Sequence, residues 1–375
     1  MSLVIVLDPG HGGEEFHGGE FGPYIEKDID LMVAKVIKSR LEQYDDVKVY
    51  MTRETDIPVE LKTRCDIAKS CNADYFFSIH FNLSSEHDKY GAEVWVPAQN
   101  SYYKKMYPVA DELMKNFDAM GLFNRGIKTK LGSGGDNYYA VIKYATNYGI
   151  PSCIIEHCHM DNIRDNWALP INSPKAYSDA LYNFGTKDAD AIARGLHLKS
   201  TQLGIDYTNY ATASSNVKSA KIIPDNSAPE INAIELISKQ GNKLTINMHA
   251  VDKNGYIQYY RYSFDNGITY SPWQDWPRTS WNKSLDDFCV TLDMPSNATS
   301  IVTMVSNGHD MTTLSNALVL SSANYSDYSC VLETKTLYKN SQIYDFGTAF
   351  GIAALVVLGI ACIKKKIGIY FDKTR

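Results

Sequence analysis

The amino-acid sequence predicts an α/β domain with a mostly parallel twisted sheet and helices on both faces, followed by an all-β Ig-like sandwich and a single transmembrane helix. Three observations carry this prediction. Up to residue 198, short apolar runs alternate with amphipathic stretches, as strands and helices do when they follow one another along a chain. From 230 to 322 the pattern changes to short alternating runs, and residues 346–363 hold no charge.

The first domain, 1–198, contains the longest regular pattern in the chain. Its expected strands are apolar runs bounded by turn residues, at 3–7, 47–51, 75–79, 92–96 and 153–155. Its expected helices place apolar residues along one stripe, at 27–43, 60–70, 102–120 and 175–198. Alternation of this kind implies a mostly parallel sheet that is covered on both faces.

Composition and charge narrow the class of protein. The chain has 375 residues, 44% of them hydrophobic and 21% charged, which is ordinary for a globular protein. The net charge of −6 argues against nucleic acid as a partner, because phosphate binding needs a basic face. The seven cysteines contain no CxxC pair, which argues against a structural zinc knuckle. A disulfide between Cys289 and Cys330 and the oligomeric state are left open.

A Ser/Thr/Asn-rich linker at 199–229 separates the two domains. Residues 230–322 carry short alternating runs with turn signals such as "DNG" between them, a pattern typical of an Ig-like or fibronectin-like sandwich. The aromatic residues allow two interpretations. Tyr259, Trp273 or Trp276 bind glycan or cell wall at the surface, or they belong to a spacer with an ordinary core. We favour the spacer.

The uncharged run at 346–363 follows a polar stalk at 323–345 and is close to the minimum length for a helix that crosses a bilayer. Three lysines follow at once, so the positive-inside rule places the tail, 364–375, in the cytoplasm and the rest outside. A buried core helix fits the lysines less well. The first residues show no signal peptide. We therefore expect a single-pass protein of the cell envelope whose export route is open.

Polar side chains follow the ends of three predicted strands. The stretch "DPGHGG" places His11 on a Gly-rich turn after the first strand, His80 and Asn82 follow the run at 75–79, and Glu156 follows the run at 153–155. Ligands of open α/β sheets bind beyond the carboxyl ends of the strands, so we expect these side chains to converge. Each taken alone also has a structural interpretation. A phosphate loop is a weaker idea, because no GK[ST] follows the glycines.

Glu26 lies at the start of the first predicted helix, close to the same edge of the sheet. It is either a charge favoured by the helix dipole or a functional carboxylate. Two histidines and one carboxylate form a known catalytic zinc set, in which a fourth position stays open. Glu156 could then accept a proton from the attacking water and pass it to a leaving amine. The pattern therefore predicts a zinc hydrolase with one ion.

Six motifs occur in a characteristic order: "IVLDPGHGG", "EKDIDL", "MTRETD", "LKTRCDIAKSCNADYFFSIHFN", "RGIK" and "IPSCIIEHCHMDN". Residues 3–198 thereby resemble the zinc-dependent N-acetylmuramoyl-L-alanine amidases. The resemblance implies hydrolysis of the amide between N-acetylmuramic acid and L-alanine in peptidoglycan. It implies His11, Glu26 and His80 as zinc ligands, Glu156 as the catalytic carboxylate, and Asn82 and Asn162 along the substrate groove. It also matches three arginines that we expect to support the fold: Arg53, Arg64 and Arg125.

The chain departs from the family pattern directly after Glu156. The family usually has a small residue and a phenylalanine there, whereas this chain has His157, Cys158 and His159. In a strand, both histidines would point away from the catalytic carboxylate, so we favour a structural or substrate-facing role over a second metal pair. His17 is a second candidate ligand near His11, and the family pattern favours His11.

Three functions follow from these observations. We favour a membrane-tethered peptidoglycan amidase. The alternatives are a zinc peptidase that acts on the stem peptides of the wall, and a non-enzymatic wall-binding or adhesion protein that keeps the fold. The sequence does not indicate the physiological role among division, sporulation, lysis and recycling.

Overall fold

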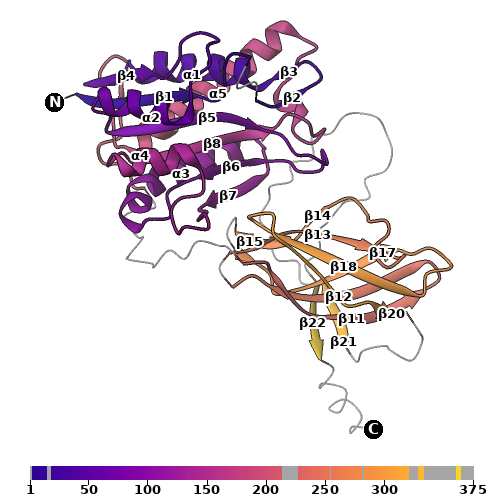
Figure 1. Ribbon diagram of the computed structural model, residues 1–375. Helices are drawn as coiled ribbons and strands as arrows, with labels where there is room; N and C mark the ends of the chain where they lie inside the picture. Colours follow the sequence, from indigo (N-terminus) through magenta and orange to yellow (C-terminus); the bar gives the residue numbers. More distant parts are fainter. Residues whose placement is uncertain are drawn as a thin grey trace. The chain divides into compact units, whose positions relative to one another are not determined.

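A computed structural model describes residues 2–14, 18–212, 227–253, 255–280 and 283–320, together with the backbone of two strands near the C-terminus. These two strands are β21 (Tyr328–Leu332) and β22 (Ile360–Lys364), which pair with each other. The chain forms two units, Met1–Asp225 and Asn226–Arg375 (Figure 1).

The first unit is built on a six-stranded sheet (Figure 1). Its order is β4-β1-β5-β8-β6-β7. The strands are β1 (Leu3–Pro9), β4 (Val47–Met51), β5 (Tyr75–Asn82), β6 (Ala92–Trp95), β7 (Asn124–Lys128) and β8 (Ser152–His159). Neighbours run parallel except β6 and β8, which are antiparallel. The mostly parallel sheet is confirmed, and β7 is a strand that the apolar runs did not predict.

Helices cover both faces of this sheet. They are α1 (Glu26–Leu41), α2 (Leu61–Ser70), α3 (Asn100–Ala119), α4 (Ala140–Asn147) and α5 (Pro174–Gly195). A 3-10 turn, η1 (Asn166–Ala168), lies between β8 and α5 in the chain. Helices α2 and α4 share a core with Phe76 and Ile154 on one face. Helix α5 packs against α1 and α3, and its Phe184 contacts Phe81 of β5 on the other face. The four predicted helices are confirmed, and α4 is additional.

The strand order brings the C-terminal ends of three strands together. Strand β1 is apolar and buried along most of its length and ends at Pro9, which lacks the N–H that a further ladder bond would need. Strands β1, β5 and β8 are neighbours, Pro9 is the Cα partner of Ile79, and His80 is the Cα partner of Glu156. The polar residues that follow these strands therefore lie at one edge of the sheet, as predicted.

Small hairpins complete the first unit. Strands β2 (Glu20–Phe21) and β3 (Tyr24–Ile25) pair just before α1. Strands β9 (Lys199–Ser200) and β10 (Ile205–Asp206) pair inside the segment that we expected to be a linker. The Ser200 hydroxyl donates to the carbonyl of Gln43 at 2.5 Å, so the first unit continues beyond residue 198.

The second unit contains two main antiparallel sheets. One has the order β11-β12-β17, and the other β14-β13-β18-β19, with β20 paired to β18. Their strands are β11 (Glu230–Gln240), β12 (Lys243–Val251), β13 (Ile257–Ser263), β14 (Gln274–Asp275), β17 (Asp287–Asp293), β18 (Ser300–Asn307), β19 (Thr312–Leu314) and β20 (Leu318–Val319). Strands β15 (Arg278–Ser280) and β16 (Lys283–Ser284) pair with each other and lie between β14 and β17 in the chain. Residues of both sheets share one apolar core; kinship with Ig domains stays a prediction.

The aromatic residues of this unit serve its packing. Tyr259 and Trp276 are buried, with 2% and 1% of their surface exposed, which rules out a surface role for these two. Trp273 is half-buried and lies against the guanidinium of Arg261. Cys289 is disulfide-bonded, and the pairing with Cys330 lies outside the side chains that the structure describes.

The predicted membrane segment lies largely outside the described residues, which do not include 346–359. The last four residues of the expected helix belong instead to strand β22 (Ile360–Lys364). Across the described part of the chain, none of the helices has the length and apolar character needed to cross a membrane.

Candidate active site

His11 lies on the turn that follows β1, in a strained backbone conformation. Its φ angle is 58°, a left-handed value that costs a non-glycine residue about 1–2 kcal/mol. Two buried arginines hold this turn. The guanidinium of Arg64 donates to the carbonyls of Pro9 and His11 at 2.7 and 2.5 Å, and that of Arg53 donates to the carbonyl of Gly10 at 2.6 Å. The surrounding structure thus enforces the placement of His11.

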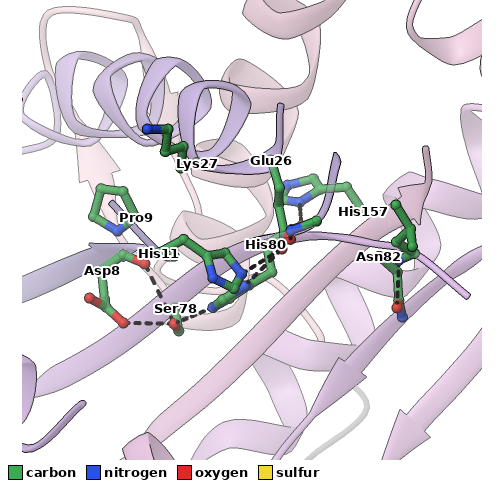
Figure 2. Close-up of polar contacts among 12 residues, drawn as sticks. Asp8, Pro9, His11, Glu26, Lys27, Ser78, His80, Asn82 and His157 are labelled. Atoms are coloured by element: carbon green, nitrogen blue, oxygen red, sulfur yellow. Dashed lines mark hydrogen bonds and ion pairs between the residues drawn. The ribbon is translucent and has the colours of Figure 1, made fainter. Parts of the chain in front are cut away.

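Glu26, the first residue of α1, lies between the two histidines (Figure 2). Its Oε1 atom is 3.0 Å from Nε2 of His11 and 3.1 Å from Nδ1 of His80. Its Oε2 atom accepts a hydrogen bond from the backbone N–H of Gly19 at 2.7 Å. Burial alone would raise the pKa of Glu26, but hydrogen bonds and charge from the two histidines outweigh it and lower the pKa to about 2.

A hydrogen-bonded chain fixes the ring of His80. Its Nε2 atom lies 3.2 Å from the Ser78 hydroxyl, which donates to Oδ2 of Asp8 at 2.7 Å (Figure 2). Nδ1 therefore faces Glu26. The backbone of Gly10 touches the same ring, because a Cβ atom at this position would lie 2.3 Å from Cε1 of His80. Only glycine leaves room for this ring.

Asp30 is a fourth donor that sequence reasoning missed. It lies one helical turn after Glu26, is fully buried, and neither carboxylate oxygen has a hydrogen-bond partner among the described residues. One donor atom from each of His11, Glu26, Asp30 and His80 lies within 4.8 Å of the others. Imidazole and carboxylate are ordinary ligands of Zn²⁺, and an unpartnered buried carboxylate beside them fits a cation. The i, i+4 spacing of Glu26 and Asp30 was the signal available in the sequence.

Glu156 lies beside this group on the neighbouring strand. It is the Cα partner of His80 and is partly exposed. The described residues give its carboxylate no hydrogen bond or ion pair. Burial raises its pKa well above the usual value, and the charges of Glu26 and Glu93 raise it further. A carboxyl group in this position, next to the donor group, is placed to take part in proton transfer.

A family model described as N-acetylmuramoyl-L-alanine amidase matches residues 5–183 of the chain. This segment belongs to that amidase family.

Several known proteins are similar to the chain. The endolysin of Bacillus phage SPP1 is 28% identical over 229 residues, which cover 60% of this chain and 78% of the endolysin. AmiC of Escherichia coli is 41% identical over 95 residues, which cover 25% of this chain and 22% of AmiC. LytC of Bacillus subtilis is 29% identical over 169 residues, which cover 43% of this chain and 30% of LytC. The chain thus spans less than a third of the length of AmiC and of LytC.

A solved structure, the catalytic domain of CwlV from Bacillus (Paenibacillus) polymyxa var. colistinus, is 26% identical to the chain. The match covers 52% of this chain and 98% of that domain, with a TM-score of 0.43.

A buried cluster of charged residues on β6 and β7 lies next to Glu156. Glu93 of β6 is the Cα partner of Glu156, and its Oε2 atom accepts hydrogen bonds at 2.5 Å from Nε of Arg125 and Nζ of Lys128. Its Oε1 atom accepts from the indole N–H of Trp95 at 2.9 Å. These contacts lower the pKa of Glu93 well below its usual range despite burial. Arg125 supports the fold, as expected.

The two asparagines expected along the substrate groove differ in exposure. Asn82, at the end of β5, is partly exposed, and its amide N–H₂ reaches Oε1 of Glu93 at 3.4 Å. Asn162 is buried, with 7% of its surface exposed, and donates to the carbonyl of His87 at 3.1 Å. It therefore joins two loops of the amidase segment. His17, the second candidate ligand, lies outside the described residues.

Proposed function

We propose that the chain hydrolyses the amide bond between N-acetylmuramic acid and L-alanine in peptidoglycan, with one zinc ion as cofactor. The observation that carries this proposal is the convergence of His11, Glu26 and His80, whose donor atoms meet within 4.8 Å, beside Glu156 on the next strand. Membership of residues 5–183 in the amidase family supports the choice of this amide as the bond that is cleaved.

The residues of the chain divide the chemistry among them. His11 through Nε2, Glu26 through Oε1 and His80 through Nδ1 would hold the ion, and Asp30 is a buried carboxylate next to them. When bound, a zinc ion acts as a Lewis acid that polarises a carbonyl and acidifies water. Glu156 would accept the proton from the attacking water and return it to the leaving amine of L-alanine. Asn82, at the end of the same strand as His80, would contact the substrate.

Analysis of digestion products tests this proposal. Full-length protein incubated with purified peptidoglycan should release intact stem peptides that begin with a free L-alanine amine and leave the lactyl carboxylate on the glycan. Mass spectrometry of the products checks this. A zinc chelator should abolish the release of stem peptides. Added zinc should restore it, because the ion then binds its protein ligands again.

Other outcomes would overturn the proposal. A peptidase would cut within the stem peptide and leave muramic acid joined to L-alanine. A wall-binding protein would sediment with peptidoglycan and release nothing, with or without zinc. Release that persists in excess chelator would remove the metal from the proposal.

Attachment to a membrane through residues 346–363 is a separate part of the proposal, supported by the uncharged run and the three lysines that follow it. Full-length protein should fractionate with membranes and resist extraction by alkaline carbonate, whereas a chain that ends at residue 345 should be soluble. Equal fractionation of the two chains would contradict the attachment.

A further inference from the structure

His157 is a fully buried histidine that the proposed reaction does not use. It follows Glu156 on β8 and has no exposed surface. Its Nδ1 atom lies 2.8 Å from the carbonyl oxygen of His80 (Figure 2), and its Nε2 atom lies 2.5 Å from Oδ2 of Asp188 on α5. Its ring stacks on Phe81, with centroids 4.5 Å apart and planes 9° from parallel. All its polar atoms thus have defined partners.

The backbone is irregular at this point. His80 is the Cα partner of Glu156, but Asn82 is the partner of His159, so β8 contains one residue more than β5 over this interval. Such bulges often lie next to active sites, where they re-aim a side chain. His157 lies within this irregular interval of β8, and its ring forms a hydrogen bond across the two strands with the peptide carbonyl of the proposed ligand His80.

Packing alone does not account for a histidine here. A phenylalanine would fill the same aromatic space beside Phe81, Phe117 and Phe184. A buried imidazole and carboxylate must instead lose their hydration, and such a pair adds little net stability. The carbonyl oxygen of His80 can only accept a hydrogen bond, so Nδ1 of His157 donates to it. What distinguishes histidine from phenylalanine is therefore its two directed contacts, and the one with the carbonyl of His80 reaches the proposed metal site.

We infer that His157 is a positioning residue for the metal site. Asp188 on α5 holds the ring of His157, and the ring holds the peptide carbonyl of His80. This contact keeps the imidazole of His80 in place beside Glu26 and Glu156. This inference rests on the proposed function, since it takes His80 as a metal ligand.

Two amide variants of the full-length chain separate the two contacts. In His157→Asn the amide N–H₂ can lie near the place of Nδ1 and keep the bond to the His80 carbonyl. In His157→Gln it reaches toward Asp188 instead. His157→Asn should keep the zinc Kd close to that of the parent, and His157→Gln should raise it at least about tenfold, as loss of contacts around metal ligands does. Competition with a chromophoric chelator measures the Kd.

His159 provides a matched control on the same strand. It is equally buried, and its Nδ1 atom lies 3.1 Å from the carbonyl of Gly91, away from His80. His159→Gln should lower the melting temperature of the metal-free chain without changing the zinc Kd. If His157→Gln does not fold, His157→Phe takes its place, because phenylalanine fills the same aromatic space without a donor for the carbonyl of His80 and should also raise the Kd about tenfold.

The results distinguish this inference from the proposed function. A parent chain that binds no zinc would overturn the proposed function and this inference with it. If the parent binds zinc but His157→Asn and His157→Gln have the same zinc Kd, the role of His157 alone is overturned. A Kd increase in His159→Gln as large as that in His157→Gln would do the same.

Discussion

Replacement of Glu156 by glutamine should lower kcat of the proposed hydrolysis by about 10²–10⁴-fold, the usual contribution of a general acid–base group. Glutamine has nearly the shape of glutamate but cannot accept the proton of the attacking water. Zinc content should stay unchanged, because Glu156 is outside the donor group of His11, Glu26, Asp30 and His80. Release of stem peptides from peptidoglycan measures kcat, and metal analysis of the purified variant measures the zinc content.

A control variant makes this result specific. Glu54→Gln changes an exposed carboxylate in the loop after β4 and should leave kcat and zinc content as in the parent. A Glu156→Gln variant that keeps kcat near the parent value would remove Glu156 from the mechanism. One that loses zinc together with activity would instead place Glu156 among the ligands.

Replacement of Arg64 by methionine should destabilise the first unit by about 3–5 kcal/mol, the cost of leaving one partner of a buried ion pair alone. Nη1 of Arg64 lies 2.8 Å from Oδ1 of Asp8, and both side chains are at most 2% exposed. The same guanidinium donates to the carbonyls of Pro9 and His11. Methionine fills similar volume but removes the cationic partner of Asp8 and the hydrogen bonds that Arg64 donates to these two carbonyls.

Urea unfolding of the full-length chain measures this loss, with the transition of the first unit identified as the one that added zinc shifts. Lys62→Met is the matched control on the same helix. Lys62 pairs with Asp66 at the surface, with 57% and 44% of the two side chains exposed, so its loss should cost about 0–1 kcal/mol. A similar cost in both variants would contradict the importance of the buried pair.

The sequence was sufficient for the parts of the fold that follow simple periodicity. The apolar runs of β1, β4, β5 and β8 and the amphipathic stripes of four helices were predicted within a few residues. Strand β7 was missed because its sequence, "NRGIK", has a glycine and two cations where a buried strand is expected to be apolar. Arg125 and Lys128 are buried there because both pair with Glu93 of β6, and no periodicity indicates such a partner across a sheet.

The candidate site was predicted from motifs more than from pattern. Strand ends pointed to His11, His80 and Glu156, and their residue types pointed to a zinc site, whereas the resemblance to a family supplied the substrate and the bond that is cleaved. Asp30 could not be singled out in advance, because an acidic pair at i and i+4 also occurs on ordinary helices. The contact of His157 depends on an irregular register between β5 and β8, and pairing register cannot be derived from one strand alone.

The reversed direction of β6 has a consequence for the loops at the edge of the sheet where the site lies. Strand β5 ends and β6 begins at the same edge of the sheet, with β8 between them, so residues 83–91 pass over the exit of β8. Asp161 and Asp165, just beyond that exit, accept hydrogen bonds from the N–H groups of Ser84 and Gly91. Insertions or deletions in this crossing segment would therefore reshape the loops beyond the end of β8 while the six strands keep their order.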